Sequence, residues 1–451
     1  MDEKREELLN DSIFKLMIKL SIPAIIGMFV IGLYSFVDAI FVGRWVGAKA
    51  LAAVSVTYPL TLINNGIAVL IGIGSASVLS RAIGSKDQQK INDIMSNMGM
   101  CNIVLSLFVT FIGITFTDAL IGLTGLSGEI FILAKSYLKI IFVGSLFVNF
   151  VQSANMIIRG EGKMKEAMII MGVGAMLNII LDPIFIKVLN LGIEGAAYAT
   201  VLSQIVQTIM TLVYFKKYSQ LVQLKKPALK KDILPDVLSV GVSAMLMQVM
   251  SLVQQTILYK MVTIYGNDQQ LVIMGITMRV MMFAFIPIWG MSQGLQPLAG
   301  INYGAKKLDR VRKSVKIFML GSTVLCLAFW LPMELAPKFI LSLFTKDQEL
   351  IAYGFEYFRL GNMAFFVSGI FIMSVTFFQA IGKAGNAGLI IMLRQIALFI
   401  PFIFIFAKAF GAIGVWYSLP ITDMTVFVVA MSLVIVELKK MLKIKGALVQ
   451  R

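Results

Sequence analysis

The hydrophobic residues of this chain form long runs, separated by short segments rich in charged residues, glycine or proline. A helix that crosses the roughly 30 Å hydrocarbon core of a bilayer needs about 20 consecutive apolar residues. The runs therefore predict twelve membrane-spanning helices, which we place at residues 14–41, 51–79, 92–118, 130–158, 166–187, 193–215, 235–263, 270–297, 311–333, 349–379, 386–408 and 412–437. The expected fold class is an all-α integral membrane protein.

The second half of the chain resembles the first. Residues 159–167 align with residues 379–387 at an offset of 220, and residues 84–87 align with residues 304–307 at the same offset. Each half contains an even number of spans, so both halves have the same orientation, as in transporters built from parallel repeats. We expect two pseudo-symmetric six-helix bundles with a substrate cleft between them, made up of an N-terminal lobe at 1–219, a cytoplasmic linker at 220–234 and a C-terminal lobe at 235–451.

Composition supports the membrane assignment. Of the 451 residues, 58% are hydrophobic and 14% are charged, whereas a soluble domain has roughly 45–50% apolar and about 25% charged residues. The chain contains no histidine, which removes the commonest general base and the commonest metal ligand. It also lacks the phosphate-binding motif G-x-x-x-x-G-K-[ST]. We therefore expect neither an enzyme nor a transporter that carries its own nucleotide-driven motor.

The basic residues predict the orientation. Most of the 40 lysine and arginine residues lie at the termini or in loops that follow even-numbered spans. The positive-inside rule then places both termini and the central linker in the cytoplasm of a multi-pass cell-membrane protein. The linker is expected to be exposed, because six lysines lie between Lys216 and Leu234. Topology and contact with anionic lipid explain the net charge of +16, so nucleic-acid binding is not expected.

Few charged residues lie within the expected spans, and each costs about 2.5–3.5 kcal/mol at a helix centre. The aspartates that lie more than two residues inside a span are Asp38, Asp182 and Asp423. Asn178 and Asp182 are four residues apart and share one helix face, and Pro183 can free a backbone carbonyl beside them. Carboxylate, amide and carbonyl oxygens suit a hard cation such as Na⁺, and a buried carboxylate can also carry a proton. The residues leave both ions open.

Several segments resemble the multidrug and toxic compound extrusion (MATE) family. They are residues 37–43 (VDAIFVG) followed by 50–53 (ALAA), residues 177–183 (LNIILDP) and residues 195–200 (GAAYAT), together with the duplicated half. The resemblance covers nearly the whole chain and is strongest to a prokaryotic branch whose coupling acids lie in the N-terminal lobe. It implies an ion- or proton-coupling site at Asp38, Asn178, Asp182 and Thr200.

Within this resemblance, Asp38, Asn178 and Asp182 are the candidate Na⁺ ligands, and no cofactor is expected beyond the coupling ion, Na⁺ or H⁺. Another branch of the family carries acids in the seventh and tenth helices. This chain departs from that pattern, because its seventh span offers glutamines such as Gln248 and Gln254 instead.

The expected function is a secondary antiporter, active as a monomer, that exports amphipathic organic cations in exchange for Na⁺ or H⁺ by alternating access. Its substrate cleft is expected to include Gln152, Gln248, Gln254, Arg279 and Asp423. For Asp423 an ion pair with Arg394 is the structural alternative. Two other classes remain open: a flippase for lipid-linked precursors, which would need Lys260, Arg279 and Arg394 to line a cationic cleft, and a passive channel or non-transporting receptor.

Overall fold

The computed structural model describes residues 2–122 and 127–449, and the regular elements in these residues are all helices. Eleven of the helices are long and apolar enough to cross a membrane. A further pair, Gly128–Val143 and Ser145–Gly160, bends by 55° at a short break and together makes one more span. The prediction of an all-α membrane protein with twelve spans is therefore confirmed.

The chain divides into two compact units. Unit 1 contains Ile26–Met245 and the residues up to Arg5, and unit 2 contains Glu6–Ile25 and the residues from Leu246 onward. The start of the first span thus belongs with unit 2, and the start of the seventh belongs with unit 1. Glycines explain both placements, because they allow helix backbones to touch. A Cβ on Gly290 would lie 2.6 Å from Ile25 Cα, and one on Gly74 would lie 2.1 Å from the Val237 carbonyl oxygen.

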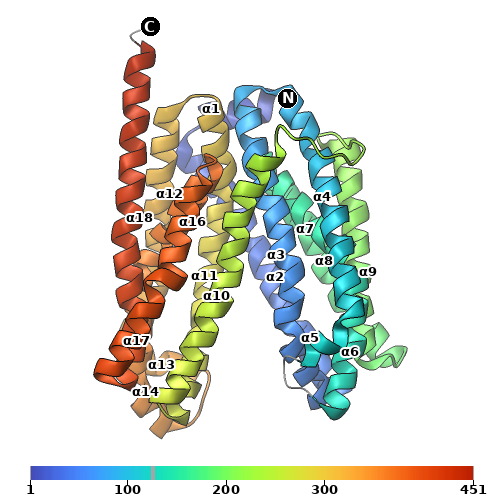
Figure 1. Cartoon of the computed structure of the whole chain (residues 1–451), viewed down its shortest axis with the longest axis vertical. Helices are drawn as coiled ribbons and strands as arrows, with labels where there is room; N and C mark the ends of the chain where they lie inside the picture. Colours follow the sequence, from blue (N-terminus) through green and yellow to red (C-terminus); the bar gives the residue numbers. More distant parts are fainter. Residues whose placement is uncertain (1, 123–126, 450–451) are drawn as a thin grey trace. The chain divides into compact units, whose positions relative to one another are not determined.

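Unit 1 holds most of the helices coloured blue to green in Figure 1. The elements that build it, in chain order, are the first residues of α1 (Asp2–Asn10), the larger part of α2 (Ile13–Phe41), the π-helical turn η1 (Val42–Val46), α3 (Ala48–Ser85), α4 (Gln88–Thr115), α5 (Thr117–Gly122), α6 (Gly128–Val143), α7 (Ser145–Gly160), α8 (Met164–Pro183), the π-helical turn η2 (Ile184–Val188), α9 (Gly192–Val213), the π-helical turn η3 (Tyr214–Tyr218) and the first third of α10 (Leu234–Tyr265).

Unit 2 holds the rest of α10, most of α1, the start of α2, and the helices coloured yellow to red in Figure 1. The remaining elements are α11 (Asp268–Gly304), α12 (Leu308–Leu335), α13 (Pro337–Ser342), α14 (Gln348–Asn362), the short 3-10 helix η4 (Phe365–Val367), α15 (Ser368–Ala380), α16 (Ala384–Met392), the π-helical turn η5 (Leu393–Ala397), α17 (Phe399–Phe410) and α18 (Ala412–Val449).

The internal repeat is visible in the backbone. Lys86 and Lys306 both adopt left-handed conformations, with φ of 59° and 58°, just after α3 and α11 respectively. Gly162 and Gly382 do the same, with φ of 80° and 78°. Non-glycine residues seldom occupy this region, so matching pairs at an offset of 220 indicate that corresponding helices end in the same way.

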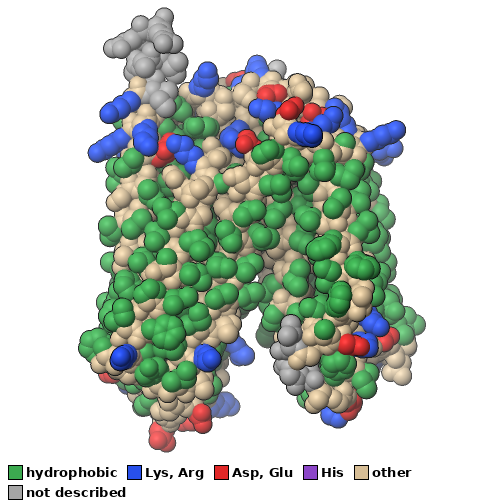
Figure 2. All heavy atoms as spheres, viewed as in Figure 1, with side chains coloured by type: hydrophobic (Ala, Val, Ile, Leu, Met, Phe, Trp, Pro, Cys, Tyr) green, Lys and Arg blue, Asp and Glu red, His purple; other side chains and the backbone are tan. Residues whose placement is uncertain are grey.

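Hydrophobic side chains cover the middle of each unit, whereas charged side chains gather towards the ends (Figure 2). Exposed side chains on α4 illustrate the pattern: Leu107, Phe108 and Phe111 are all more than half exposed. In water such a surface would be unfavourable. It is the surface expected of helices that face lipid.

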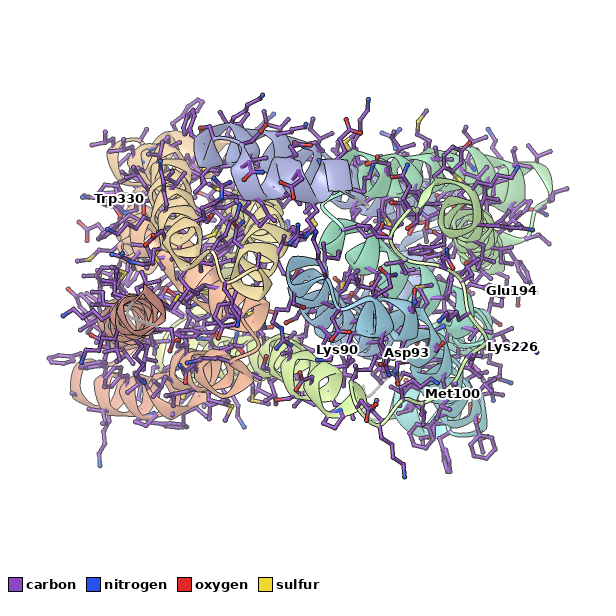
Figure 3. All side chains as sticks on the ribbon, turned by 90° about the horizontal axis from the view of Figure 1, so that it is seen from above. Lys90, Asp93, Met100, Glu194, Lys226 and Trp330 are labelled. Carbon is purple, nitrogen blue, oxygen red and sulfur yellow. The ribbon has the colours of Figure 1, made fainter. Side chains whose placement is uncertain are left out.

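The linker between the two halves is less exposed than the sequence indicates. Residues 219–233, here called the strap, lie along unit 1 with Leu221, Val222 and Ile233 buried. The Ala228 amide donates to the Ser96 carbonyl at 3.1 Å, and the Lys230 amide donates to Asn97 Oδ1 at 2.8 Å. Its lysines dominate the sequence pattern, but these apolar residues and backbone hydrogen bonds hold the strap against the protein. Figure 3 looks onto this end, with Lys226 on the strap and Lys90 and Asp93 on α4.

Glu161, directly after α7, fixes the beginning of the strap. Its carboxylate is 2% exposed and accepts hydrogen bonds from the Tyr214 hydroxyl at 2.7 Å and the Ser219 hydroxyl at 2.6 Å. Burial raises the pKa of Glu161 from 4.5 to about 7, although these hydrogen bonds, the Val222 amide and the charge of Lys163 oppose the rise. Nothing in the sequence pattern identified this buried acid.

Candidate ion-coupling site

Close packing of α8 against α9 builds the site in unit 1. A Cβ on Gly195 would lie 2.8 Å from the Phe185 carbonyl group, so only glycine lets the start of α9 approach η2 this closely. At the other end Gln207 of α9 lies over Gly174 and donates to the carbonyls of Ile170 and Met171 at 3.3 and 3.2 Å. These contacts place Thr200 of α9 beside the middle of α8.

Asn178 is the centre of the site. Its Nδ2 donates to Asp182 Oδ1 one turn further along α8 and to Thr200 Oγ1 on α9, both at 3.4 Å. Asn178 is 2% exposed and Asp182 is fully buried. The predicted sharing of one helix face by Asn178 and Asp182 is confirmed, and the amide holds the carboxylate and hydroxyl on either side of it.

Asp38 reaches the same place from α2. The helix turns into η1 four residues after Asp38, and η1 packs against η2, which follows Asp182 and Pro183 on α8. The carboxyl groups of Asp38 and Asp182 lie close enough to interact electrostatically. π-Helical turns are rare and concentrate at functional sites, and here one follows each acid. The structure therefore joins all four residues that the resemblance implies.

Three buried oxygens at this site have no hydrogen-bond donor among the described residues. They are Asp38 Oδ1, Asn178 Oδ1 and Asp182 Oδ2. Two carboxylates and an amide oxygen at one buried site leave negative charge that a small cation or a shared proton would neutralise. Among the described residues, no group of three or more His, Cys, Asp and Glu side chains is placed to hold a metal ion. Carboxylate and amide oxygens are hard donors, and they suit an alkali cation or a proton.

Two tyrosines of the site were not predicted from the sequence. Tyr34 and Tyr137 lie within electrostatic range of both Asp38 and Asp182. Tyr34 precedes Asp38 by four residues on α2 and so shares its face, which is a signal that could have been used. Tyr137 comes from α6 and has no comparable spacing, so it becomes visible only in the fold.

The residues expected in a substrate cleft are divided between the units. Gln152 is half-buried on α7 in unit 1. In unit 2, Gln248 is half-buried, Arg279 is exposed, and Gln254 is buried, with Nε2 donating to the Arg394 carbonyl at 3.4 Å. Their part in binding substrate therefore stays a prediction.

Asp423 forms an ion pair with Arg394. Arg394 Nε lies 2.8 Å from Asp423 Oδ1, and Arg394 Nη2 lies 3.2 Å from Asp423 Oδ2. The guanidinium also stacks 4.8 Å from the centre of the Phe371 ring. Both side chains are mostly buried, at 17% and 10% exposed. The ion pair that is the structural alternative for Asp423 is thus present, and η5 carries Arg394.

Two relatives of similar sequence are multidrug export proteins. The chain is 29% identical over 437 residues to the multidrug export protein MepA of Staphylococcus aureus (strain MSSA476), covering 96% of both chains. It is 28% identical over 427 residues to MepA of Staphylococcus haemolyticus (strain JCSC1435), covering 94% of both.

Solved structures show the same fold. A crystal structure of MATE in the bent conformation matches with a TM-score of 0.93 and 26% identity, covering 98% of this chain and 99% of the other. An outward-facing multidrug resistance MATE transporter matches with a TM-score of 0.90 and 27% identity, covering 96% and 98% of the two chains.

The MatE family model matches residues 23–184 and 243–405. The two matched segments lie in the two halves of the chain and cover most of it, in agreement with the internal repeat. The resemblance derived from the sequence is thereby confirmed. The chain belongs to the MatE family, the multidrug and toxic compound extrusion transporters.

Proposed function

We propose that this protein exports small amphipathic molecules, mainly organic cations, in exchange for Na⁺ or H⁺. The observation that carries the proposal is the set of three buried oxygens without donors on Asp38, Asn178 and Asp182. Buried polar groups are normally hydrogen-bonded, and charged groups inside a membrane mark ion or proton pathways. Export fits the function named for the MepA relatives.

The coupling site works by neutralising two carboxylates. When neither ion is bound, Asp38 and Asp182 repel each other in a surrounding of low dielectric. A proton shared between them, or Na⁺ held by them with the Asn178 oxygen, removes this repulsion. Asn178 keeps Asp182 and Thr200 in place through its amide hydrogens. Ion binding therefore stabilises the arrangement in which α2 lies against α8.

Export requires that ion and substrate weaken each other's binding. Thermodynamic linkage makes this effect reciprocal, so an ion that lowers substrate affinity is itself bound less tightly when substrate is present. Substrate would bind in a cleft that includes Gln152, Gln248, Gln254 and Arg279, and leave when the ion enters the carboxylate site. The protein would work as a monomer in the cell membrane, with both termini in the cytoplasm.

A flippase for lipid-linked precursors has less support. Such a protein needs free cationic side chains to bind a phosphate headgroup. One of the three cations available for that purpose, Arg394, is already paired with Asp423 by two hydrogen bonds. This pairing leaves the antiporter as the better-supported function.

Uptake of a fluorescent cationic dye into proteoliposomes tests the proposal. Dye should accumulate when an outward Na⁺ or proton gradient is imposed, and the ion that drives uptake is the coupling ion. Preloaded unlabelled substrate should accelerate dye entry, because a carrier exchanges bound substrate faster than it produces net flow. Equal uptake with and without any gradient, and no acceleration by preloading, would indicate a channel and contradict the proposal.

A further inference from the structure

A second set of buried polar side chains crosses unit 1, separate from the candidate coupling site. It contains Asn64 on α3, Asn102 and Ser106 on α4, and Ser145 and Asn149 on α7. All five are 0–2% exposed. Their counterparts at the 220-residue offset are Ala284, Ser322, Cys326, Phe365 and Gly369, so unit 2 does not repeat the set. Polar groups in the middle of a membrane bundle need partners.

Hydrogen bonds fix which atom of each side chain in this set donates and which accepts. Asn102 Nδ2 donates to the Leu146 carbonyl at 3.3 Å, and a carbonyl can only accept. Asn102 therefore presents its Oδ1 to the Ser106 hydroxyl, which donates to it at 3.4 Å. Ser106 Oγ in turn accepts from Asn149 Nδ2 at 2.9 Å, and Asn64 Oδ1 lies 3.5 Å from the same nitrogen. Each amide orientation follows from the one before it.

The chain of bonds ends in three atoms that the protein leaves without a partner. Asn64 Nδ2, Asn149 Oδ1 and Ser145 Oγ are buried and have no hydrogen-bond partner in the part of the chain that the structure describes. They are complementary, because the first is a donor, the second an acceptor and the third either. Rotating the amide group of Asn64 or Asn149 by 180° would place one N–H group against another, and it would not give the three atoms hydrogen-bond partners.

Helix geometry brings the three atoms together. α3 and α7 run parallel in register, since Asn64 faces Asn149 and the Ala68 carbonyl accepts from Ser153 at 3.2 Å, both at a separation of 85 residues. Ser145, Asn149 and Ser153 are spaced four apart and share this face. Ser145 therefore lies one turn from Asn149 on the side that faces α3.

The same register explains why the space is polar. Pro59 of α3 is level with Gly144, where α6 and α7 meet at their 55° bend, because these two residues are also 85 apart. Proline removes a backbone hydrogen bond in one helix, and the bend interrupts the ladder in the other. Both helices are thus irregular at the level next to Ser145 and Asn64.

We infer that a structural water molecule binds here and bridges α3 to α7. It accepts a hydrogen bond from Asn64 Nδ2, donates one to Asn149 Oδ1 and forms a third with Ser145 Oγ. Buried waters typically make about three hydrogen bonds to polar groups that lack other partners. A sodium ion does not fit, because the Asn64 N–H would point at it, and the chain of bonds fixes that amide in place.

A structure of the purified full-length protein at a resolution better than about 2.5 Å tests the site directly. A peak should lie at hydrogen-bond distance, about 2.7–3.2 Å, from all three atoms. Crystals soaked in thallium should show no anomalous peak there. A dry site, or a thallium peak among these side chains, would overturn the inference.

Stability measurements give an independent result. Ser145→Ala removes one partner of the water and should lower the apparent melting temperature by roughly 2–4 °C, whereas Ser145→Thr keeps the hydroxyl and should stay close to the parent. Ser80→Ala is the matched control, because Ser80 is also fully buried but donates to the Ser77 carbonyl of its own helix at 3.1 Å. Equal melting temperatures for Ser145→Ala and Ser80→Ala would contradict the bridge.

Discussion

Asn178 and Asp182 lie one turn apart on α8, and a hydrogen bond of 3.4 Å joins Asn178 Nδ2 to Asp182 Oδ1. The bond uses the amide nitrogen and one carboxylate oxygen, so Asp182 Oδ2 and Asn178 Oδ1 take no part in it. Both of these oxygens, like Asp38 Oδ1, lack a donor within the described residues. A pair that only stabilised the helix would need no such free oxygens, so the arrangement favours a site that accepts an ion.

We expect Asp38→Asn and Asp182→Asn each to abolish ion-coupled efflux while the protein still inserts and folds. Each substitution removes a negative charge from the carboxylate pair and replaces one acceptor oxygen with a donor. Dye uptake into proteoliposomes under an ion gradient measures the loss. Asp118→Asn is the control, since Asp118 is 62% exposed and paired with Lys135. Normal gradient-driven uptake by either buried variant would show that its carboxylate is not needed for coupling.

Much of this site was predictable because membrane interiors contain few charged residues. Asp38, Asn178 and Asp182 stand out on that ground and by their spacing, whereas Thr200 was implied only by the family resemblance. Tyr137 could not be predicted, because aromatic residues are common in apolar helices and its place depends on how α6 packs.

Two other features could not be predicted from the sequence and became visible only in the structure. The many lysines of the strap indicated an exposed linker, so its packing against the protein through Leu221 and Val222 was not predicted. Asp423 had two interpretations that only the observed distance to Arg394 could separate. Long-range contacts of this kind depend on tertiary packing, which spacing along the chain does not encode.

Gln248→Ala and Gln254→Ala should alter substrate preference or apparent substrate affinity more than ion dependence. Both lie on α10 in unit 2, whereas the candidate ion site lies in unit 1. Efflux of two different dyes, each measured across a range of Na⁺ concentrations, separates the two effects. Gln88→Ala on the exposed start of α4 provides the control. Loss of ion coupling with drug binding intact would place the coupling site in unit 2.

Breaking the Arg394–Asp423 ion pair should lower the free energy of unfolding. Arg394→Gln or Asp423→Asn leaves a mostly buried charge without its partner, which typically costs about 3–5 kcal/mol. The double variant should lose less unfolding free energy than the two single variants lose together, because it leaves no unpaired charge. Unfolding of the purified variants in detergent measures these differences. Strictly additive losses would mean that the pair contributes no coupling energy.

Docking of the strap should weaken as the pH rises. Glu161 has a pKa of about 7 where it is buried, against an ordinary value near 4.5 once exposed to water. Glu161 therefore binds its proton more tightly when the strap is docked. This proton binding stabilises the docked strap, and the stabilisation is lost as the pH rises from about 4.5 to about 7. Hydrogen exchange at the strap amides, corrected for intrinsic rates, should show opening increase up to about a hundredfold from pH 5 to pH 8.

Glu161→Gln is the control for this effect. The neutral amide cannot ionise. Its oxygen can accept a hydrogen bond from one of the two hydroxyls of Tyr214 and Ser219, and its NH2 group can donate to the other. Strap opening in this variant should be nearly independent of pH. If the parent and Glu161→Gln show the same pH dependence, another group must control the strap.

The most direct test of the central claim is isothermal titration of the purified protein with Na⁺ at pH 6 and pH 8. If Na⁺ and a proton compete for the oxygens of Asp38, Asn178 and Asp182, Na⁺ must displace the shared proton. Its affinity should then be higher at pH 8 than at pH 6, and Asp182→Asn should abolish the binding. Na⁺ binding that is measurable yet equal at the two pH values, or that persists in Asp182→Asn, would contradict a shared site.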